Sequence, residues 1–502
     1  MRMMMLRNNA PACRRPFHLF VLIALFLLAL PAWARLDIRV GMQLEPPTLD
    51  PTQTAAAAAG EITYCNLFEG LTVIDGDGQL TPRLAKTWSV SDDGLTYTFS
   101  LRKDVRFHDG KRFNARSAAF SIKRIVSADS KNPQRKWFEK IRSVEATSEH
   151  VLQIHLNHPD SLLTFALALP AAVMVHPDSV AGNATHPIGT GPYRLAEWLP
   201  GQKLKLKRNA DYWGEKPYLE QAEFYFMQTT AGTENMLAEG MVDGLVSVTR
   251  VTNRFGGRPD YKMSNRQLES KMLLAINNGR PPFDDIRVRR ALSHAINKNE
   301  LRTMYGAQFN PDLIGSHFPP SHPAYVDLVD RYPYDPKRAR ELLREAGVDK
   351  GTPVKLTVPP TDYGRYGGLM LAEDLEAIGF KVELDPVDWK TWMQSVFTDK
   401  DYALTLIIHV EPMDLNIYAR DNYYFNYAND AFKAIWKQVL DARTDKELNH
   451  WLGEAQKQIA EDAVNVFLFI RPERNLMHKD LQGLWENSSI PSFVLEDIHW
   501  TH

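Results

Sequence analysis

The sequence contains very little cysteine. Only Cys13 and Cys65 occur in 502 residues. If the segment that carries Cys13 is removed, Cys65 stands alone and an internal disulfide is excluded. Cys65 lies in the run YCNLF. We interpret it as a small buried thiol, and the alternative is a reactive nucleophile.

Motifs for catalysis are also missing. The sequence contains no HExxH, GxSxG, GxxxxGKS/T or CxxC motif. The SxxK motif from Ser100 to Lys103 lies in a strand-like segment with no KTG after it, so we interpret it as a chance match. The 15 histidines are scattered, and those in loop-like stretches have no carboxylate or cysteine at the spacing of a metal site. These are His176, His186, His317 and His322. The sequence therefore predicts no enzyme, no bound metal and no cofactor.

Long hydrophobic runs are absent except near the N-terminus. There, 12 apolar residues from Leu19 to Leu30 follow four arginines and no acidic residue, and the sequence Ala-Trp-Ala ends at Ala34. This order is typical of a secretory signal peptide over residues 1–34, with cleavage after Ala34. A bilayer needs about 20 apolar residues, so this run is too short to span it and the mature chain is expected to be soluble. The alternative is an uncleaved signal that anchors the protein.

The same segment indicates how the chain is exported. Cys13 precedes the apolar run and is lost with it, so no cysteine is left to carry a lipid at the new N-terminus. Arg14 and Arg15 faintly resemble a twin-arginine signal. Because the run after them is strongly apolar and no cofactor motif follows, we favour ordinary export of the unfolded chain.

An excess of basic residues is absent as well. The chain has 59 lysines and arginines against 61 aspartates and glutamates. Removal of the signal takes away four basic residues and no acidic ones, which leaves a mature net charge of −6. Nucleic acids and anionic membranes both require a basic face on their partner, so neither is expected to bind.

The mature chain is long enough for several lobes, and its pattern predicts mixed α/β structure. About 468 residues exceed the limit of about 250–300 for one hydrophobic core. Alternating or continuous apolar residues predict strands at 97–101, 152–156, 204–206, 402–408 and 467–470. Helical spacing from Val288 to Ile296 predicts a helix that is capped by Asp284 or Asp285.

Further helices are predicted toward the C-terminus. Asp335 and Pro336 have the order of a cap and a first helical residue, and Gly347 closes that helix. A helix that ends at Gly379 lies between two strand-like segments, which predicts an α/β unit over about 353–384. One long helix is predicted for the 430s to 440s.

Several segments, in the same order, resemble one known family. They are GMQLEPPTLDP (41–51), LFEGL (67–71), the stretch from LTPRLAK to SIKR (80–124), the GTGPY and RNADYWG elements of 186–214, LLAINNGRPPFDDIRVRRALSHAINKNEL (273–301) and YDPKRARELLREAG (334–347). They resemble the extracytoplasmic solute-binding proteins of the oligopeptide, dipeptide and nickel class, family 5, which serve ABC importers. Agreement is weakest over about 385–470. Most of these motifs are turns and packing positions, so they indicate the scaffold rather than the ligand.

The resemblance implies an α/β fold of the periplasmic-binding-protein type, with mixed-sheet lobes, a third inserted domain and a ligand cleft at a two-crossing hinge. The implied domains are domain I (35–73, 186–262 and 476–502), domain II (74–185) and domain III (263–475). The implied function is that of a non-enzymatic, non-lipidated, monomeric periplasmic protein. It would capture a peptide-like ligand by cleft closure and deliver it to inner-membrane permease subunits and their ATPase.

The resemblance also implies where the ligand ammonium would bind. Burying a peptide's charged ends costs several kcal/mol per ion unless each is paired. In the resembling peptide binders, an aspartate in the loop after a buried strand of domain III pairs with the ligand ammonium. Here that loop is HVEPMDLN, residues 409–416, where Asp414 or Glu411 is the candidate. The loop departs from the family pattern, and either residue could instead serve a turn or a salt bridge.

Other candidate residues surround this loop. Tyr423, Tyr424 and Trp389 offer aromatic faces to a ligand, or else they pack in the core. Arg420 and Arg365 are candidates for a ligand carboxylate, because a guanidinium forms bidentate pairs, and the alternative is simple surface exposure. The remaining candidates, near the expected cleft, are Asn277, Tyr64 and Glu45.

Three other functions stay open. The unusual 409–416 loop is compatible with the same binding role for a metal chelate, an opine-like conjugate or a small glycan. A hydrolase that used the cleft would need Ser100 or Cys65 to react with an active-site probe. A periplasmic chaperone or sensor partner has no sequence feature that separates it from a binding protein.

Overall fold

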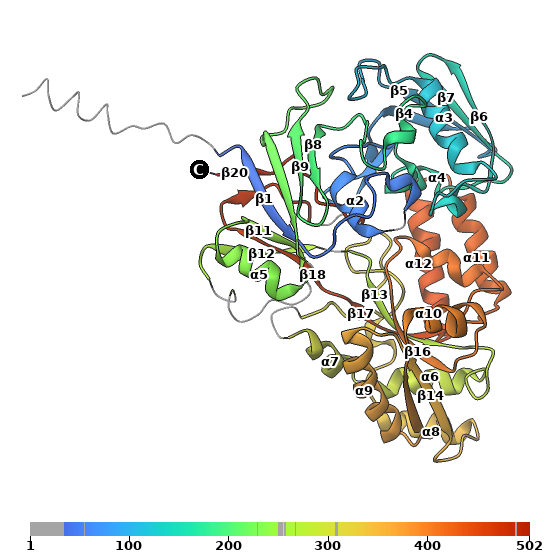
Figure 1. The fold of residues 1–502 in the computed structure, drawn as a ribbon. Coiled ribbons are helices and arrows are strands. Elements are labelled where there is room, and N and C mark those ends of the chain that lie inside the picture. Colours follow the sequence, from blue (N-terminus) through green and yellow to red (C-terminus); the bar gives the residue numbers. More distant parts are fainter. Residues whose placement is uncertain are drawn as a thin grey trace, which may run out of the picture.

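The computed structural model describes residues 35–54, 56–227, 229–248, 255, 258–266, 268–306, 310–486 and 489–501. These residues form three lobes, each built on one larger sheet (Figure 1). The predicted signal peptide lies outside the described residues. Within them, no helix is long and apolar enough to cross a membrane.

The first lobe contains a seven-stranded sheet in the order β12-β18-β11-β1-β10-β9-β8. Its strands are β1 (Asp37–Met42), β8 (Tyr193–Leu199), β9 (Lys203–Arg208), β10 (Gln221–Phe226), β11 (Gly244–Val248), β12 (Tyr261–Arg266) and β18 (Glu473–His478). β1 pairs parallel with both β10 and β11, and β18 pairs antiparallel with β11 and β12. Helices α2 (Ala57–Thr63) and α5 (Thr230–Ala238) and the short strands β19 (Leu481–Gln482) and β20 (His499–Trp500) complete it. The sheet therefore joins three separate stretches of chain.

The second lobe contains a four-stranded antiparallel sheet in the order β4-β5-β7-β6. Its elements are β4 (Ala85–Val90), β5 (Thr96–Leu101), β6 (Ile141–Ser148), β7 (Val151–Leu156), α3 (Ala115–Val126) and α4 (Leu163–Ala166), beside the hairpin β2 (Thr72–Ile74) and β3 (Leu80–Pro82). Tyr97, Phe99 and Leu101 alternate into the core as predicted. Gly94 has a φ of +71°, which the turn between β4 and β5 requires.

The third lobe contains a five-stranded mixed sheet in the order β15-β14-β16-β13-β17. Its elements are β13 (Lys271–Ile276), β14 (Pro353–Val358), β15 (Lys381–Pro386), β16 (Leu404–His409), β17 (Asn465–Ile470), α6 (Ile286–Ala295), α7 (Lys298–Leu301), α8 (Pro336–Glu345) and α9 (Asp362–Ala377). The predicted caps are confirmed, since Asp285 accepts from the Arg287 N–H and Asp335 from the Arg338 N–H. The predicted α/β unit is confirmed as the parallel pair β14 and β15 joined by α9.

The prediction of one long helix in the 430s to 440s is wrong. The chain forms α11 (Asp430–Asp441) and α12 (Asp445–Glu461), with α10 (Trp389–Trp392) nearby in the lobe. Ala442 leaves the helical conformation with a ψ of 143°, and Thr444 starts α12 with a capping box to Glu447. The two helices pack on each other and lie beside the second lobe (Figure 1). A capping box stabilises a new helix start, so it explains the break.

The chain passes twice between the seven-stranded and five-stranded sheets, from β12 to β13 and from β17 to β18. Both crossings are short, since they join Arg266 to Lys271 and Ile470 to Glu473. The domain ends placed at 262 and 475 fall inside β12 and β18, a few residues from these crossings. The domain division stays a prediction, and the sheets place the change of lobe at the crossings.

Candidate ligand-binding cleft

A tight turn after β16 lies at the centre of the candidate site. The strand ends at His409, and Met413 adopts the left-handed conformation with a φ of 57°. A 3-10 helix over Asp414–Ala419 starts directly after it. Met413 and Asp414 are neighbours in sequence, yet Met413 lines one cavity and Asp414 lines another. The turn therefore forms part of the wall between two cavities.

The cavity beside Asp414, which we call the aromatic cavity, has a volume of about 430 Å³. One wall comes from the second lobe and includes Gln134, Lys136, Trp137 and Leu169. The other wall comes from the third lobe and includes Trp389, Trp392, Phe397, Tyr423 and Tyr424. The rings contact one another, with 5.7 Å between the centroids of Trp389 and Trp392. A cavity between two lobes with aromatic walls is suited to a small organic ligand.

Asp414 is buried in a network of hydrogen bonds within the chain. Its Oδ1 accepts from Lys271 Nζ at 2.8 Å and from His317 Nε2 at 2.8 Å. Its Oδ2 lies 3.3 Å from His409 Nδ1. Lys271 is fully buried and also donates to the backbone carbonyl of Glu411 at 2.6 Å. The carboxylate of Asp414 is thus occupied by groups of the protein itself.

The charges in this network stabilise one another. Burial by itself would raise the pKa of Asp414, but His317 and Lys271 outweigh it and hold that pKa well below the usual range. Burial would lower the pKa of Lys271, yet Asp414 and Glu269 raise it above its ordinary value. Burial lowers the pKa of His317 to about 4, so this imidazole is neutral at pH 7. Asp414 and Lys271 therefore form a charged pair beside neutral His317.

Three residues of the network could in principle hold a metal ion. His317, His409 and Asp414 offer ligand atoms that all lie within 4.8 Å of one another. The sequence analysis missed this grouping because about 90 residues separate His317 from the other two. The Lys271 ammonium already donates to Asp414 Oδ1 from 2.8 Å, however. A second cation beside it would be repelled, so the geometry favours an internal ion pair over a metal.

Three other charged side chains line the aromatic cavity, and each is without an ion-pair partner among the described residues. Glu411 comes from the turn, Arg420 follows the 3-10 helix, and Lys136 comes from the second lobe. The Arg420 guanidinium is positioned by the Asn416 side chain, to which its Nη2 donates at 3.0 Å. It also lies over the Tyr423 ring, 6.0 Å from the centroid. These groups are available to a charged ligand.

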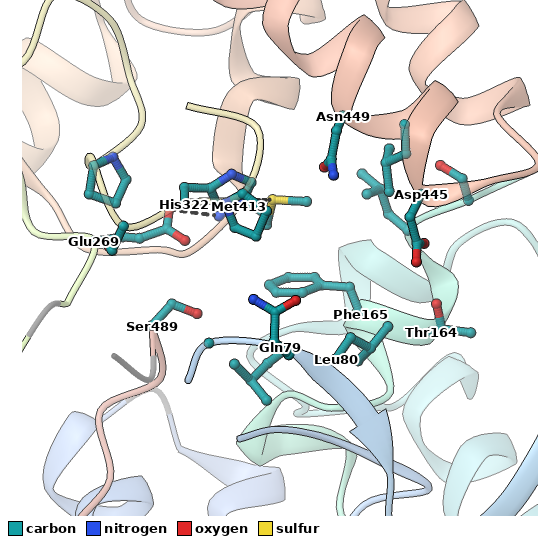
Figure 2. A pocket seen from close by; sticks show the side chains of 18 of the residues that line it. Gln79, Leu80, Thr164, Phe165, Glu269, His322, Met413, Asp445, Asn449 and Ser489 are labelled. Atoms are coloured by element: carbon teal, nitrogen blue, oxygen red, sulfur yellow. Dashed lines mark hydrogen bonds between the residues drawn. The ribbon is translucent and has the colours of Figure 1, made fainter. Parts of the chain in front are cut away.

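The second cavity, which we call the junction cavity, has a volume of about 240 Å³. Figure 2 shows Gln79, Phe165 and Glu269 around it, together with residues from the other elements that meet there. Glu269 Oε2 accepts from the Met413 N–H at 3.0 Å. Phe165 packs on Trp137 of the aromatic cavity, with 5.6 Å between ring centroids. The turn and this aromatic pair therefore lie between the two cavities.

Tyr423, Tyr424 and Trp389 are brought together in the aromatic cavity. Trp389 is 44% exposed and offers a free face, whereas Tyr424 is 2% exposed. The hydroxyl of Tyr424 lies 2.9 Å from His409 Nε2, so it also supports the network around Asp414. Six of the ten candidates thus line the aromatic cavity: Trp389, Glu411, Asp414, Arg420, Tyr423 and Tyr424. Their contact with a ligand stays a prediction.

Four other candidates are placed outside both cavities. Arg365 is exposed on α9 and pairs with Asp362. Asn277 uses its amide to bond the carbonyls of Lys400 and Tyr402, both at 3.0 Å. The structure thus assigns Arg365 a surface position and Asn277 a role in holding the backbone, and it brings neither to the cleft.

Tyr64 and Glu45 belong to the first lobe. Tyr64 is 1% exposed, and its hydroxyl donates to the Ala168 carbonyl at 2.7 Å. Glu45 accepts from the Trp198 indole N–H at 2.9 Å and lines a separate surface hollow. Neither side chain reaches the two cavities of the cleft, because its polar group is already used in local structure.

Sequence reasoning missed Lys136, Trp137, Lys271 and His317. Lys136 and Trp137 lie in the second lobe, at a segment without any distinguishing motif. Lys271 gave one usable signal, since it is a charged residue at the start of the apolar strand KMLLAI. A charged residue on a buried strand is rarely left unpaired, so it points to a buried partner.

Comparison with known proteins identifies the class that this fold and cleft define. Residues 79–430 match the model of the bacterial extracellular solute-binding proteins, family 5. The chain belongs to this family. This membership also confirms the predicted fold class, because solved structures of such proteins share the architecture.

Individual relatives agree with this assignment. The chain is 31% identical over 494 residues to the glutathione-binding protein GsiB of Shigella flexneri, covering 92% of this chain and 94% of that protein. The match to GsiB of Salmonella choleraesuis is 31% over 346 residues and spans 65% of the length of that relative. The di/tripeptide-binding protein 2 of Pseudomonas aeruginosa is 28% identical over 422 residues, with 73% of this chain and 76% of that protein covered.

Among solved structures, the substrate-binding protein CtaP of Listeria monocytogenes superposes with a TM-score of 0.81 at 21% identity, over 93% of this chain and 100% of that one. A dipeptide-binding protein of Pseudoalteromonas, solved with Met-Leu, gives a TM-score of 0.74 at 22% identity, over 93% and 100% of the two chains. At this level of identity the likeness shows the fold alone.

Proposed function

We propose that this chain is the periplasmic solute-binding component of an ABC importer and that it captures a short peptide-like ligand in the aromatic cavity. The proposal rests on one observation: charged side chains without an ion-pair partner among the described residues lie beside aromatic rings in a cavity whose walls come from two lobes. The names of the relatives, which include di/tripeptide-binding and glutathione-binding proteins, support a peptide-like ligand. Delivery to a membrane permease with its ATPase follows from the family role.

The arrangement suits the two ends of a peptide. Glu411 is the carboxylate that is free to pair with a ligand ammonium, because Asp414 is already held by Lys271. Arg420 is positioned by Asn416 and can receive a ligand carboxylate. The aromatic rings between them accept apolar or planar side chains with little selectivity. Of the two ammonium candidates from the sequence, we therefore favour Glu411 over Asp414.

Closure of the cleft is proposed to occur about the two short crossings between the larger sheets. Two crossings restrict the motion of the lobes to a hinge. The second and third lobes already contact each other beside the junction cavity, where Ser161 bonds the end of α11. A ligand that bridges both walls would stabilise this closed arrangement, and its release would follow opening.

Native mass spectrometry of protein purified from its own periplasm tests the proposal directly. We expect a bound mass that matches a short peptide or peptide-like molecule. Refolded, ligand-free protein should then give heat on titration with pools of peptides of two to five residues. A metal chelate, an opine-like conjugate or a glycan in place of a peptide would overturn the ligand class. The absence of any bound molecule and of any heat would overturn the binding role.

Substitution of Glu411 tests the site. Glu411→Gln should weaken peptide binding about ten-fold, because it removes a charged hydrogen bond worth about 1.5 kcal/mol. Glu383→Gln, an exposed residue on β15, makes the same chemical change away from the cavity and should leave affinity unchanged. Equal affinities of the two variants would contradict the placement of the ammonium at Glu411.

A further inference from the structure

The charges that line the aromatic cavity are not balanced. Four charged residues line it: Lys136, Glu411, Asp414 and Arg420. The negative charge of Asp414 is compensated by Lys271, whose ammonium donates to it at 2.8 Å. That pair is fully buried and belongs to the fold. The charges that remain for a ligand are the cations of Lys136 and Arg420 and the anion of Glu411.

The network beneath the cavity holds two carboxylates, Asp414 and Glu269, on the one ammonium of Lys271, and neither carboxylate pairs with a cation that lines the cavity. Glu269 is 1% exposed and accepts from Lys271 and from the Met413 N–H, so it faces the junction cavity and the turn rather than Arg420. Among the described residues, neither Lys136 nor Arg420 has a carboxylate partner within ion-pair distance. Two cations that share one cavity repel each other, and a bound anion relieves that repulsion.

The two cations also come from opposite walls. Lys136 lies in the 3-10 helix Arg135–Phe138 of the second lobe, and Arg420 directly follows the 3-10 helix of the third lobe. A ligand with two carboxylates can therefore engage both lobes at once. A ligand with one carboxylate leaves one of the two cations without a partner when the lobes approach each other.

We propose that the cavity selects peptide-like ligands that carry one more carboxylate than ammonium groups. The class comprises short peptides with one acidic side chain and amino-acid conjugates with a second carboxylate. The ligand ammonium pairs with Glu411, one carboxylate pairs with Arg420, and the second pairs with Lys136. This inference rests on the proposed function, since it names the charge of the ligand of the same cavity.

Matched peptide pools provide the test. Three pools of peptides of two to five residues contain alanine and one variable residue, which is Glu, Gln or Lys. Titration calorimetry of ligand-free protein should give the order Glu above Gln above Lys. We expect the Glu pool to bind about ten-fold more tightly than the Gln pool, which is the usual effect of one charged contact. The preference should shrink at high salt, because exposed charges are screened.

Two variants locate the preference. Arg420→Gln and Lys136→Gln should each bring the Glu pool to within about two-fold of the Gln pool, since each removes one cation. Arg365→Gln removes a cation from the exposed face of α9 and should retain the full preference.

The outcomes separate this inference from the proposed function. Equal binding of the three pools, or a preference for the Lys pool, would overturn the charge selection and leave peptide binding intact. Failure of every pool, together with no peptide in the purified protein, would overturn peptide binding itself. A preference for the Glu pool that survives in both variants would show that other residues cause it, and it would also reject the inference.

Discussion

At the scale of single residues, Lys271 determines which carboxylates beside the cleft are already paired. Its ammonium is fully buried and bonds Asp414, Glu269 and the carbonyl of Glu411. A buried ammonium is stable only when such partners replace its water, and here they do. Asp414, the residue that the sequence offered first for a ligand ammonium, is therefore already paired. The sequence could not reveal this, because 143 residues separate the two partners.

Replacement of Lys271 tests the structural importance of this pair. In Lys271→Met, two carboxylates lose their shared cation within the protein interior. We expect a loss of about 3–5 kcal/mol in the free energy of unfolding, measured by urea denaturation with circular dichroism. The double variant Lys271→Met with Asp414→Asn should recover part of that loss, because only one buried charge is then left unpaired.

An exposed ion pair provides the control. Lys355 pairs with Asp385 at 2.9 Å, and half of its side chain is exposed. Lys355→Met should change the free energy of unfolding by no more than about 0.5 kcal/mol. If Lys271→Met were equally mild, the ammonium of Lys271 would not stabilise Asp414 in the way the distances indicate.

At the scale of helices and strands, elements with clear local signals were predictable and those that depend on distant partners were not. Asp335 as the N-cap and Gly347 as the residue that ends the helix predicted α8 from the sequence, and the structure confirms both. The break between α11 and α12 also had a signal, since Thr444 and Glu447 form the spacing of a capping box. The prediction of one long helix did not take this capping box into account.

The contact between α11 and the second lobe is an element-scale feature with no sequence signal. Ser161 donates from its Oγ to the Val439 carbonyl at 2.6 Å and from its N–H to the Leu440 carbonyl at 3.1 Å. These carbonyls belong to the last turn of α11, where the usual amide four residues on is missing. Val439 otherwise accepts only a long bond, 3.4 Å from the Ala442 N–H. The second lobe thus caps a helix of the third lobe. Such a contact exists only while the two lobes are together.

We expect Ser161→Ala to favour separation of these lobes. The lost hydroxyl bond is worth about 1 kcal/mol, which corresponds to about a five-fold loss of ligand affinity by calorimetry. Because Ser161 also lines the junction cavity, small-angle X-ray scattering of ligand-free protein is needed, and it should show a larger radius of gyration. Ser127→Ala, which removes a hydroxyl bond to Arg124 within one lobe, should change neither quantity. A compact Ser161→Ala protein would show that the contact does not hold the lobes together.

At the scale of the whole molecule, the three-lobe plan could not be obtained from periodicity. Strand and helix patterns predicted mixed α/β structure and the chain length predicted more than one lobe, but the pairing of β1 with β10 and β11 joins segments about 200 residues apart. The plan came from the resemblance to a family. The aromatic cavity lies between two lobes. Lys136 and Trp137, in its second wall, are far in sequence from the 409–416 loop, so that loop gave no indication of them.

Buried histidines link the stability of the whole molecule to pH. Burial lowers the pKa of His108 and His317 to about 4 and that of His322 to about 3, from an ordinary value of 6.5. Between pH 6.5 and these values the unfolded chain binds protons that the folded chain does not, so acid favours unfolding. Asp374 acts in the opposite direction, because burial raises its pKa to about 6. Burial also raises the pKa of Asp160, Glu269 and Glu496, which act in the same direction as Asp374. We expect the three histidines together to outweigh these carboxyl groups.

We therefore expect the free energy of unfolding to fall as the pH is lowered from 6.5 to 5, by about 1.5 kcal/mol for each of the three histidines before the opposing effect of the carboxyl groups is subtracted. Urea denaturation at a series of pH values measures the slope. His322→Gln removes one of the three groups and should remove about a third of the histidine contribution to the slope. His186→Gln changes an exposed histidine and should keep the full slope. A protein that is equally stable at pH 6.5 and 5, or a His322→Gln variant with an unchanged slope, would mean that the buried imidazoles take up protons without unfolding.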